Sequence, residues 1–136
     1  MFYGVDMMRI VVADDETAVR SALKLLLEQD NRFQVVGEVC DAASLMMVIE
    51  LAGADVLLLD WELPGLTTDL VADLVEGKRP FPPIVAMSSR PEARKAAHNM
   101  GINHFISKSD PPNRVRETLG KLMIDKVHRT SEVRRT

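Results

Sequence analysis

Polar side chains able to do chemistry stand directly after four of the apolar runs in this chain. Asp14 and Asp15 follow RIVVA, Asp60 follows VLLL, Ser88 follows PIVAM, and Lys108 closes HFISK. Each has an ordinary explanation alone, because an acid or a hydroxyl after a strand is often a helix cap and a lysine is usually solvated. An acid is costly to bury without a partner, however. The group becomes informative if the fold brings its members together.

Brought together, these residues would suit phosphoryl transfer assisted by Mg²⁺. Clustered carboxylates repel one another without a cation, and a site of oxygen ligands suits Mg²⁺. Phosphoryl transfer needs mainly alignment and charge neutralisation. In this interpretation Asp60 is the nucleophile that forms an aspartyl phosphate, while Asp15 binds the metal directly and Asp14 helps through water. Lys108 offsets charge on the phosphoryl oxygens, and Ser88 donates a hydrogen bond to one of them.

The elements that carry these residues alternate regularly along the chain. Five short apolar runs, rich in Val and Ile, predict buried parallel strands at 9–13, 33–39, 55–59, 83–87 and 104–108. Amphipathic or alanine-rich segments between them predict helices at 17–29, 43–53, 67–77, 91–101 and from about 112. This alternation predicts an α/β fold, an open parallel sheet with helices on both faces. Ligands of such folds bind beyond the carboxyl ends of the strands, where all the polar residues above would meet.

Several residues predict where the helices begin and end. Asp15 or Thr17 is expected to cap the first helix, and Gly53 is expected to end the second. Pro91 is expected in the first turn of the fourth helix, which ends at Gly101.

The composition narrows the class of protein. A length of 136 residues suits one domain, and a net charge of -3 gives no reason to expect nucleic-acid binding by the domain as a whole. The single cysteine, Cys40, cannot form an internal disulfide and is expected to be a small buried hydrophobe. No apolar run approaches a membrane span, and MFYGVDMM does not resemble a secretory signal. A cytoplasmic location is therefore expected.

The ordered motifs resemble those of the response-regulator receiver domain of two-component signalling, in the CheY-like superfamily. The matching stretches are VVADDE, LLLDWELPG, VAMSS and FISK, and VVGEVCDAASL is similar to the second strand of the subfamily that usually carries a C-terminal helix-turn-helix. The resemblance covers roughly residues 8–128. It implies a flavodoxin-like (βα)5 three-layer sandwich with strand order 2-1-3-4-5. Residues 1–7 would then be an N-terminal extension, and 129–136 a polar basic tail or the start of a linker.

The resemblance also implies a function and a set of site residues. A histidine kinase or phosphotransfer protein would phosphorylate Asp60 with Mg²⁺, and Asp14, Asp15, Ser88 and Lys108 carry over individually. The backbone carbonyl of Glu62 is implied as a further metal ligand. Phe105 resembles an aromatic residue that turns inward when the serine moves, although a simple core role is equally compatible with the sequence.

This chain departs from the common family pattern in two ways, in the spacing around Ser88 and in Ser109, which follows Lys108 where many relatives have a proline. The spacings from Asp60 to Ser88 and from Ser88 to Lys108 are slightly short, which puts the placement of the fourth helix in question. Glu62 and Arg90 lie two residues beyond Asp60 and Ser88, where they would flank an incoming hydrolytic water. We hypothesise that they influence the lifetime of a phosphorylated state.

The leading interpretation is a signalling switch and not an enzyme acting on other substrates. One form of this interpretation is the regulatory domain of a transcriptional regulator. A phosphorylation-dependent dimer is expected through the surface of Arg94, Lys95, His98 and Asn99 or through the first and last helices. No direct nucleic-acid or membrane contact by this domain is expected. Alternatives are a pseudo-receiver that binds partners without phosphorylation and, less favoured, a phosphatase with an aspartyl nucleophile. A flavin protein is disfavoured because the first loop is acidic.

Overall fold

Five parallel strands form a single sheet, in the order β2-β1-β3-β4-β5. The computed structural model describes residues 7–77 and 81–135. The strands are β1 (Met8–Ala13), β2 (Phe33–Val39), β3 (Val56–Asp60), β4 (Ile84–Ser88) and β5 (His104–Ser107). The predicted flavodoxin-like strand order is therefore confirmed, and the carboxyl ends of the strands lie at one edge.

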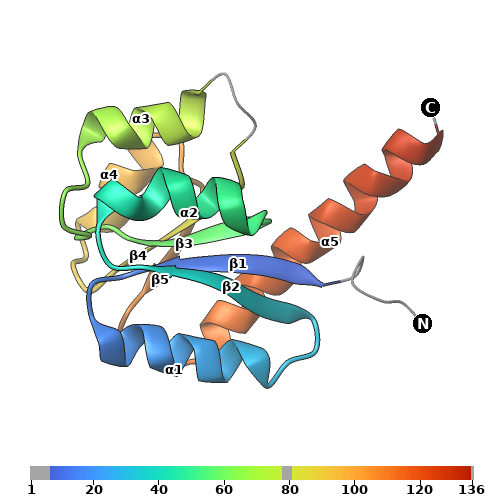
Figure 1. Ribbon diagram of the computed structural model, residues 1–136, viewed down its shortest axis with the longest axis horizontal. Coiled ribbons are helices and arrows are strands. Elements are labelled where there is room, and N and C mark those ends of the chain that lie inside the picture. Colours follow the sequence, from blue (N-terminus) through green and yellow to red (C-terminus); the bar gives the residue numbers. More distant parts are fainter. Residues whose placement is uncertain (1–6, 78–80, 136) are drawn as a thin grey trace.

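Helices cover both faces of this sheet. They are α1 (Thr17–Glu28), α2 (Leu45–Ala52, after the 3-10 turn η2, Ala42–Ser44), α3 (Thr68–Glu76), α4 (Ala93–Asn99) and α5 (Asn113–Arg135). Figure 1 shows α2, α3 and α4 on one face, and α1 and α5 on the other. The predicted three-layer sandwich is confirmed.

The central strands are apolar throughout because both of their faces are covered. All five residues of β3 are buried. Leu57 and Leu59 pack into the core under α2, α3 and α4, whereas Leu58 packs into the core under α1 and α5. Burying one such side chain contributes about 1.5–3 kcal/mol. Asp60, at the end of this strand, is therefore held by a rigid, doubly covered element.

The predicted cap of the first helix is wrong. The N-cap residue is Glu16, which makes no capping hydrogen bond through its side chain, and Thr17 already lies inside α1. The exposed Asp15 lies in the loop beside other acids. Instead, the Glu16 N–H donates to Asp14 Oδ1 over 2.9 Å, so the turn before the helix is closed by the buried acid that ends the strand.

The start of the fourth helix also differs from the prediction. Pro91 lies before the helix, which begins at Ala93, because the Ala93 N–H donates to the Arg90 carbonyl over 3.2 Å and closes a turn first. The predicted end of the second helix is confirmed, because Gly53 ends α2 with a φ of 63° in the left-handed region.

Cys40 is exposed, which corrects the expectation that it is buried. It comes directly after Val39, which is 2% exposed at the end of the edge strand β2, and successive strand residues face opposite ways. At the other end of the chain, the backbone of the predicted polar tail continues α5 as far as Arg135. Residues 1–6 of the predicted extension lie outside the described residues. Among the described residues no helix is long and apolar enough to cross a membrane.

The close packing of α2 on β2 leads to a first prediction. A Cβ atom at Gly37 would lie 2.8 Å from Val48 Cγ1, too close for a stiff side chain to accommodate. Gly37→Ala is expected to lower the free energy of unfolding by about 1–3 kcal/mol, measured by urea denaturation. Gly120→Ala is the control, because its nearest neighbour is the flexible guanidinium end of Arg32 at 3.1 Å. Equal stability of the Gly37 variant and the wild type would contradict this packing.

Candidate functional site

Two buried aspartates stand at the carboxyl ends of β1 and β3. Asp14 is 0% exposed and Asp60 is 2% exposed. Each uses its Oδ1 to accept the backbone N–H two residues further on, from Glu16 over 2.9 Å and from Glu62 over 3.0 Å. This local turn fixes both carboxylates and leaves their Oδ2 atoms for other partners.

Lys108 is the partner of both free oxygens. Its Nζ lies 2.7 Å from Asp14 Oδ2, 3.4 Å from Asp60 Oδ2 and 3.7 Å from Glu16 Oε1. The Lys108 N–H donates to the Ser88 carbonyl over 2.9 Å, which fixes the residue just beyond β5 to the end of β4. One ammonium therefore faces the ends of two other strands.

Burial and charge shift the acid–base properties of this group. Burial raises the pKa of Asp60, the nearby carboxylates of Asp14 and Glu62 raise it further, and the Glu62 N–H and Lys108 only partly oppose them. Burial alone would lower the pKa of Lys108, but the carboxylates of Asp14 and Asp60 outweigh it and raise that pKa. Lys108 is therefore cationic at neutral pH, and the site holds more negative than positive charge.

The acidic group fits a divalent cation with oxygen ligands. Carboxylate oxygens of Asp14, Asp15 and Asp60 all lie within 4.8 Å of one another. The ammonium of Lys108 is the partner of the buried Asp14 Oδ2 among the described residues, at 2.7 Å. Carboxylate oxygens gathered this closely suit a hard cation such as Mg²⁺, which takes oxygen ligands. The role of the Glu62 carbonyl stays a prediction.

Ser88 lies at the end of β4 and is 1% exposed. Its hydroxyl donates to the carboxylate of Glu62, with Oγ 2.8 Å from Oε1 and 2.9 Å from Oε2. It also accepts the Arg90 N–H over 2.9 Å. The sequence led us to expect a metal contact from the Glu62 backbone and did not predict this contact of its side chain. The sequence signal for this contact was weak: Glu62 lies two residues after the end of β3, and β3 neighbours β4.

Phe105 lies inward, with 8% of its surface exposed in the core under α2, α3 and α4. The guanidinium of Arg94, on α4, stacks over its ring at 4.7 Å from the centroid. The aromatic ring and a basic side chain of α4 are therefore coupled by a cation–π contact. Its role as a switch stays a prediction.

Arg20 is a further residue that the sequence did not suggest. Its Nη1 donates to the Asp14 carbonyl over 2.7 Å, and its Nε lies 3.3 Å from Glu38 Oε1. It therefore fixes the loop that carries the first two acids to both α1 and β2. The sequence signal was weak, since the residue is one of several charged positions on α1.

The backbone around Asp60 is held as firmly as its side chain. The Trp61 N–H donates to the Met87 carbonyl over 2.8 Å, and the Leu63 N–H donates to the Asp60 carbonyl over 3.1 Å. The loop beyond β3 therefore stays against the end of β4.

Comparison with known proteins agrees with this geometry. A family model described as the response regulator receiver domain matches residues 10–120. Protein-glutamate methylesterase/protein-glutamine glutaminase 1 of Cereibacter sphaeroides is 32% identical over 74% of this chain and 28% of its own length. Transcriptional regulatory protein GlnL of Bacillus subtilis is 30% identical over 79% of this chain and 34% of its length. The chain thus spans about a third of these relatives.

Solved structures share the fold. A CheY-like receiver domain protein from Methanospirillum hungatei gives a TM-score of 0.75 at 22% identity, covering 90% of this chain and 98% of that one. RcsB from Salmonella enterica serovar Typhimurium, bound to a promoter with a phosphomimetic, gives 0.77 at 24% identity, covering 87% and 61%. These likenesses establish the fold, and the family match extends over most of the chain. The chain therefore belongs to the response regulator receiver domain family of two-component systems.

Proposed function

We propose that this chain is a phosphoacceptor switch, phosphorylated on Asp60 with Mg²⁺ by a histidine kinase or phosphotransfer protein. The observation that supports it best is the arrangement of the two buried aspartates, whose free Oδ2 atoms share the ammonium of Lys108. A buried acid with one oxygen fixed and the other directed at a cation is prepared to act as a nucleophile.

The residues of the site have separate tasks. Asp14, Asp15 and Asp60, with the Glu62 carbonyl, would hold Mg²⁺. When bound, the cation would neutralise charge on the incoming phosphoryl group. Asp60 Oδ2 would then bond to phosphorus as the bond from phosphorus to the donor breaks. Lys108, already beside Asp60, would hold one phosphoryl oxygen, and the Ser88 hydroxyl would donate to another.

An apolar groove of about 460 Å³ lies next to this site. Its walls come from α1, the ends of β4 and β5 and the start of α5; they include Leu25, Leu26, Met87, Ile106, Pro112 and Val115. Lys108 also lines the groove. Because Lys108 lines the groove and contacts Asp60, a helix of a phosphodonor protein bound there would lie next to the site, and the groove is the proposed docking surface of the donor.

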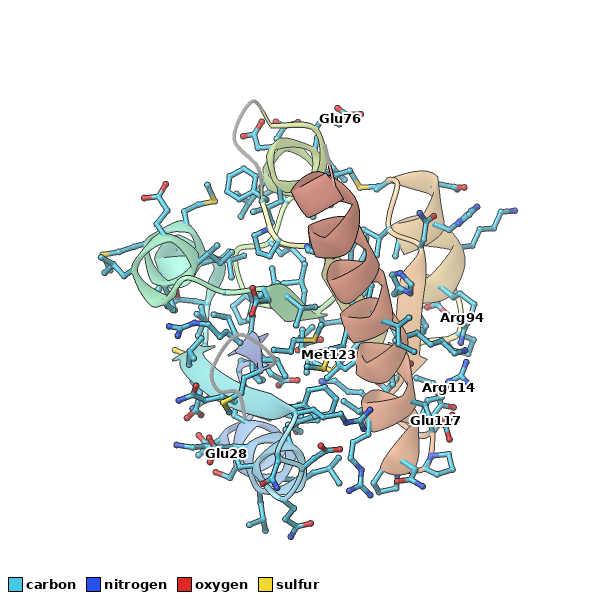
Figure 2. All side chains as sticks on the ribbon, turned by 90° about the vertical axis from the view of Figure 1, so that its right-hand side faces the viewer. Glu28, Glu76, Arg94, Arg114, Glu117 and Met123 are labelled. Atoms are coloured by element: carbon cyan, nitrogen blue, oxygen red, sulfur yellow. The ribbon has the colours of Figure 1, made fainter. Side chains whose placement is uncertain are left out.

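The signal would leave through α4 or through α1 and α5. Figure 2 shows Arg94 of α4 on the same side of the view as Arg114 and Glu117 of α5. Arg94 also stacks on Phe105, so movement of the ring would move the surface of α4 that carries Arg94, Lys95, His98 and Asn99. Dimerisation through this surface, or through α1 and α5, is the proposed output, and a joined DNA-binding domain would make the protein a transcriptional regulator. In this proposal the receiver catalyses only its own phosphorylation and dephosphorylation.

The direct test is intact mass after incubation with acetyl phosphate and Mg²⁺. One phosphoryl group, about 80 Da, is expected to add to the wild type and to be released by hydroxylamine, as an acyl phosphate requires. Asp60→Asn should gain nothing, and omission of Mg²⁺ should prevent the gain. Folded wild-type protein that stays unmodified would contradict the proposal and favour a pseudo-receiver.

The raised pKa of Asp60 predicts that its ionisation destabilises the fold. Because the folded-state pKa lies above the ordinary value of 3.8, stability is lost as the pH rises from 3.8 through the folded pKa. Without Mg²⁺, Asp60→Asn is expected to be more stable than the wild type at pH 7, on the order of 1 kcal/mol by urea denaturation. The difference should shrink as the pH falls and should vanish below 3.8, where wild-type Asp60 becomes protonated in the unfolded state as well as in the folded state.

Mg²⁺ provides the control for this stability prediction. It should stabilise the wild type by binding the folded state and should affect the Asn variant much less. A wild type more stable than Asp60→Asn in the absence of Mg²⁺ would show that the Lys108 ion pair outweighs burial and repulsion.

The docking groove predicts a selective defect. Leu25→Glu places a charge on an α1 side chain that is 66% exposed, so folding should be preserved. Phosphotransfer from a phosphohistidine protein that modifies the wild type should slow about tenfold relative to modification by acetyl phosphate, since an unpaired charge is costly to bury in an apolar interface. Leu51→Glu, on α2 and 82% exposed, is the matched control outside the groove. Equal slowing of phosphotransfer by Leu25→Glu and Leu51→Glu would contradict the proposal that the groove is the docking surface.

A further inference from the structure

Glu62 contacts both the proposed nucleophile and the hydroxyl beside it. Its backbone N–H donates to Asp60 Oδ1 over 3.0 Å, and its carboxylate accepts the Ser88 hydroxyl. The loop after β3 therefore connects the ends of β3 and β4 through a single residue.

The contact occupies the hydrogen-bonding capacity that Ser88 needs for phosphorylation. A serine hydroxyl has one proton to donate. That proton is directed at the Glu62 carboxylate, 2.8 Å from Oε1 and 2.9 Å from Oε2, while the Arg90 N–H occupies a lone pair over 2.9 Å. In this arrangement Ser88 cannot also donate to a phosphoryl oxygen.

The hydrogen bond between Ser88 and Glu62 joins a buried hydroxyl to an exposed residue. The burial of Ser88 makes the bond strong, and the exposure of Glu62 makes it reversible. Ser88 is 1% exposed, and a hydrogen bond from a buried hydroxyl to a carboxylate is stronger than a bond between neutral groups. Glu62, in contrast, is an exposed residue. Its carboxylate can therefore turn into solvent and be hydrated when the hydroxyl is withdrawn.

We propose that Glu62 is a positioning residue that holds the Ser88 hydroxyl away from the phosphoryl site, and that phosphorylation transfers this hydrogen bond from Glu62 to a phosphoryl oxygen. The inference rests on the proposed function. No covalent bond changes in this exchange, and Ser88 keeps its proton. Glu62 thereby opposes the phosphorylated state and sets how readily the site accepts a phosphoryl group.

The test combines Glu62→Ala, Glu62→Gln, Ser88→Ala and the double variant Glu62→Ala/Ser88→Ala. Modification by acetyl phosphate with Mg²⁺ is expected to be about tenfold faster in Glu62→Ala, the size of one charged hydrogen bond. Glu62→Gln should gain less, because an amide oxygen can still accept from Ser88. The gain should vanish when Ser88 is also alanine, since the effect passes through the hydroxyl. The same gain without the hydroxyl would overturn the proposal in favour of charge repulsion alone.

A second measurement is independent of phosphorylation. The Arg90 amide donates to Ser88 Oγ, so its hydrogen exchange reports whether that oxygen is held. Exchange in unmodified protein is expected to be several-fold faster in Glu62→Ala than in the wild type, with an intermediate rate in Glu62→Gln. An Arg90 amide that exchanges equally fast in Glu62→Ala and in the wild type would overturn the proposal that Glu62 holds the Ser88 hydroxyl. If acetyl phosphate modifies no form of the protein, the proposed function fails, and the Arg90 amide alone decides whether Glu62 holds Ser88.

Discussion

The ammonium of Lys108, placed between two buried carboxylates, is the interaction on which the functional edge of this protein depends. Asp14 directly follows β1, Asp60 ends the neighbouring strand β3, and Lys108 follows β5 at the far edge of the sheet. Carboxylates this deeply buried are tolerated only with an opposing charge. The cation therefore holds the ends of β1 and β3 in a geometry that their own repulsion opposes. A divalent cation would relieve the same repulsion, which explains why one place suits both a lysine and a metal.

A repeated local turn prepares this edge before any long-range contact forms. The side-chain oxygens of Asp14, Asp60 and Ser88 each accept the backbone N–H two residues further along the chain. Short polar side chains favour this turn because it satisfies the first amide that leaves the sheet. The turn also fixes each side chain at its strand end, so the three groups have little freedom to lose when a ligand binds.

The sequence predicted the sheet and the meeting of the polar residues because both follow from simple rules. Near-continuous apolar runs separated by helical segments determine a parallel sheet, and every carboxyl end of such a sheet lies at one edge. The bond between Glu62 and Ser88 could not be predicted, because it depends on the path of two loops that are distant in sequence. The same holds for Arg20, whose contact with the Asp14 carbonyl has no pattern in the sequence. The predicted caps at Asp15 and Thr17 failed because a buried acid closed the turn instead.

The length of α5 has a mechanical consequence for any signal that leaves this domain. Val115, Leu119 and Leu122, all in the first half of the helix, pack into the core beside the sheet. Beyond them the helix runs on to Arg135 and extends away from the sheet in Figure 1. At 1.5 Å per residue its 23 residues span roughly 34 Å. The part beyond Leu122 acts as a lever arm of roughly 20 Å, so a tilt of about 10° where the packing ends would displace the far end by roughly 3–4 Å. A small rearrangement near the site therefore becomes a larger displacement at the far end of α5.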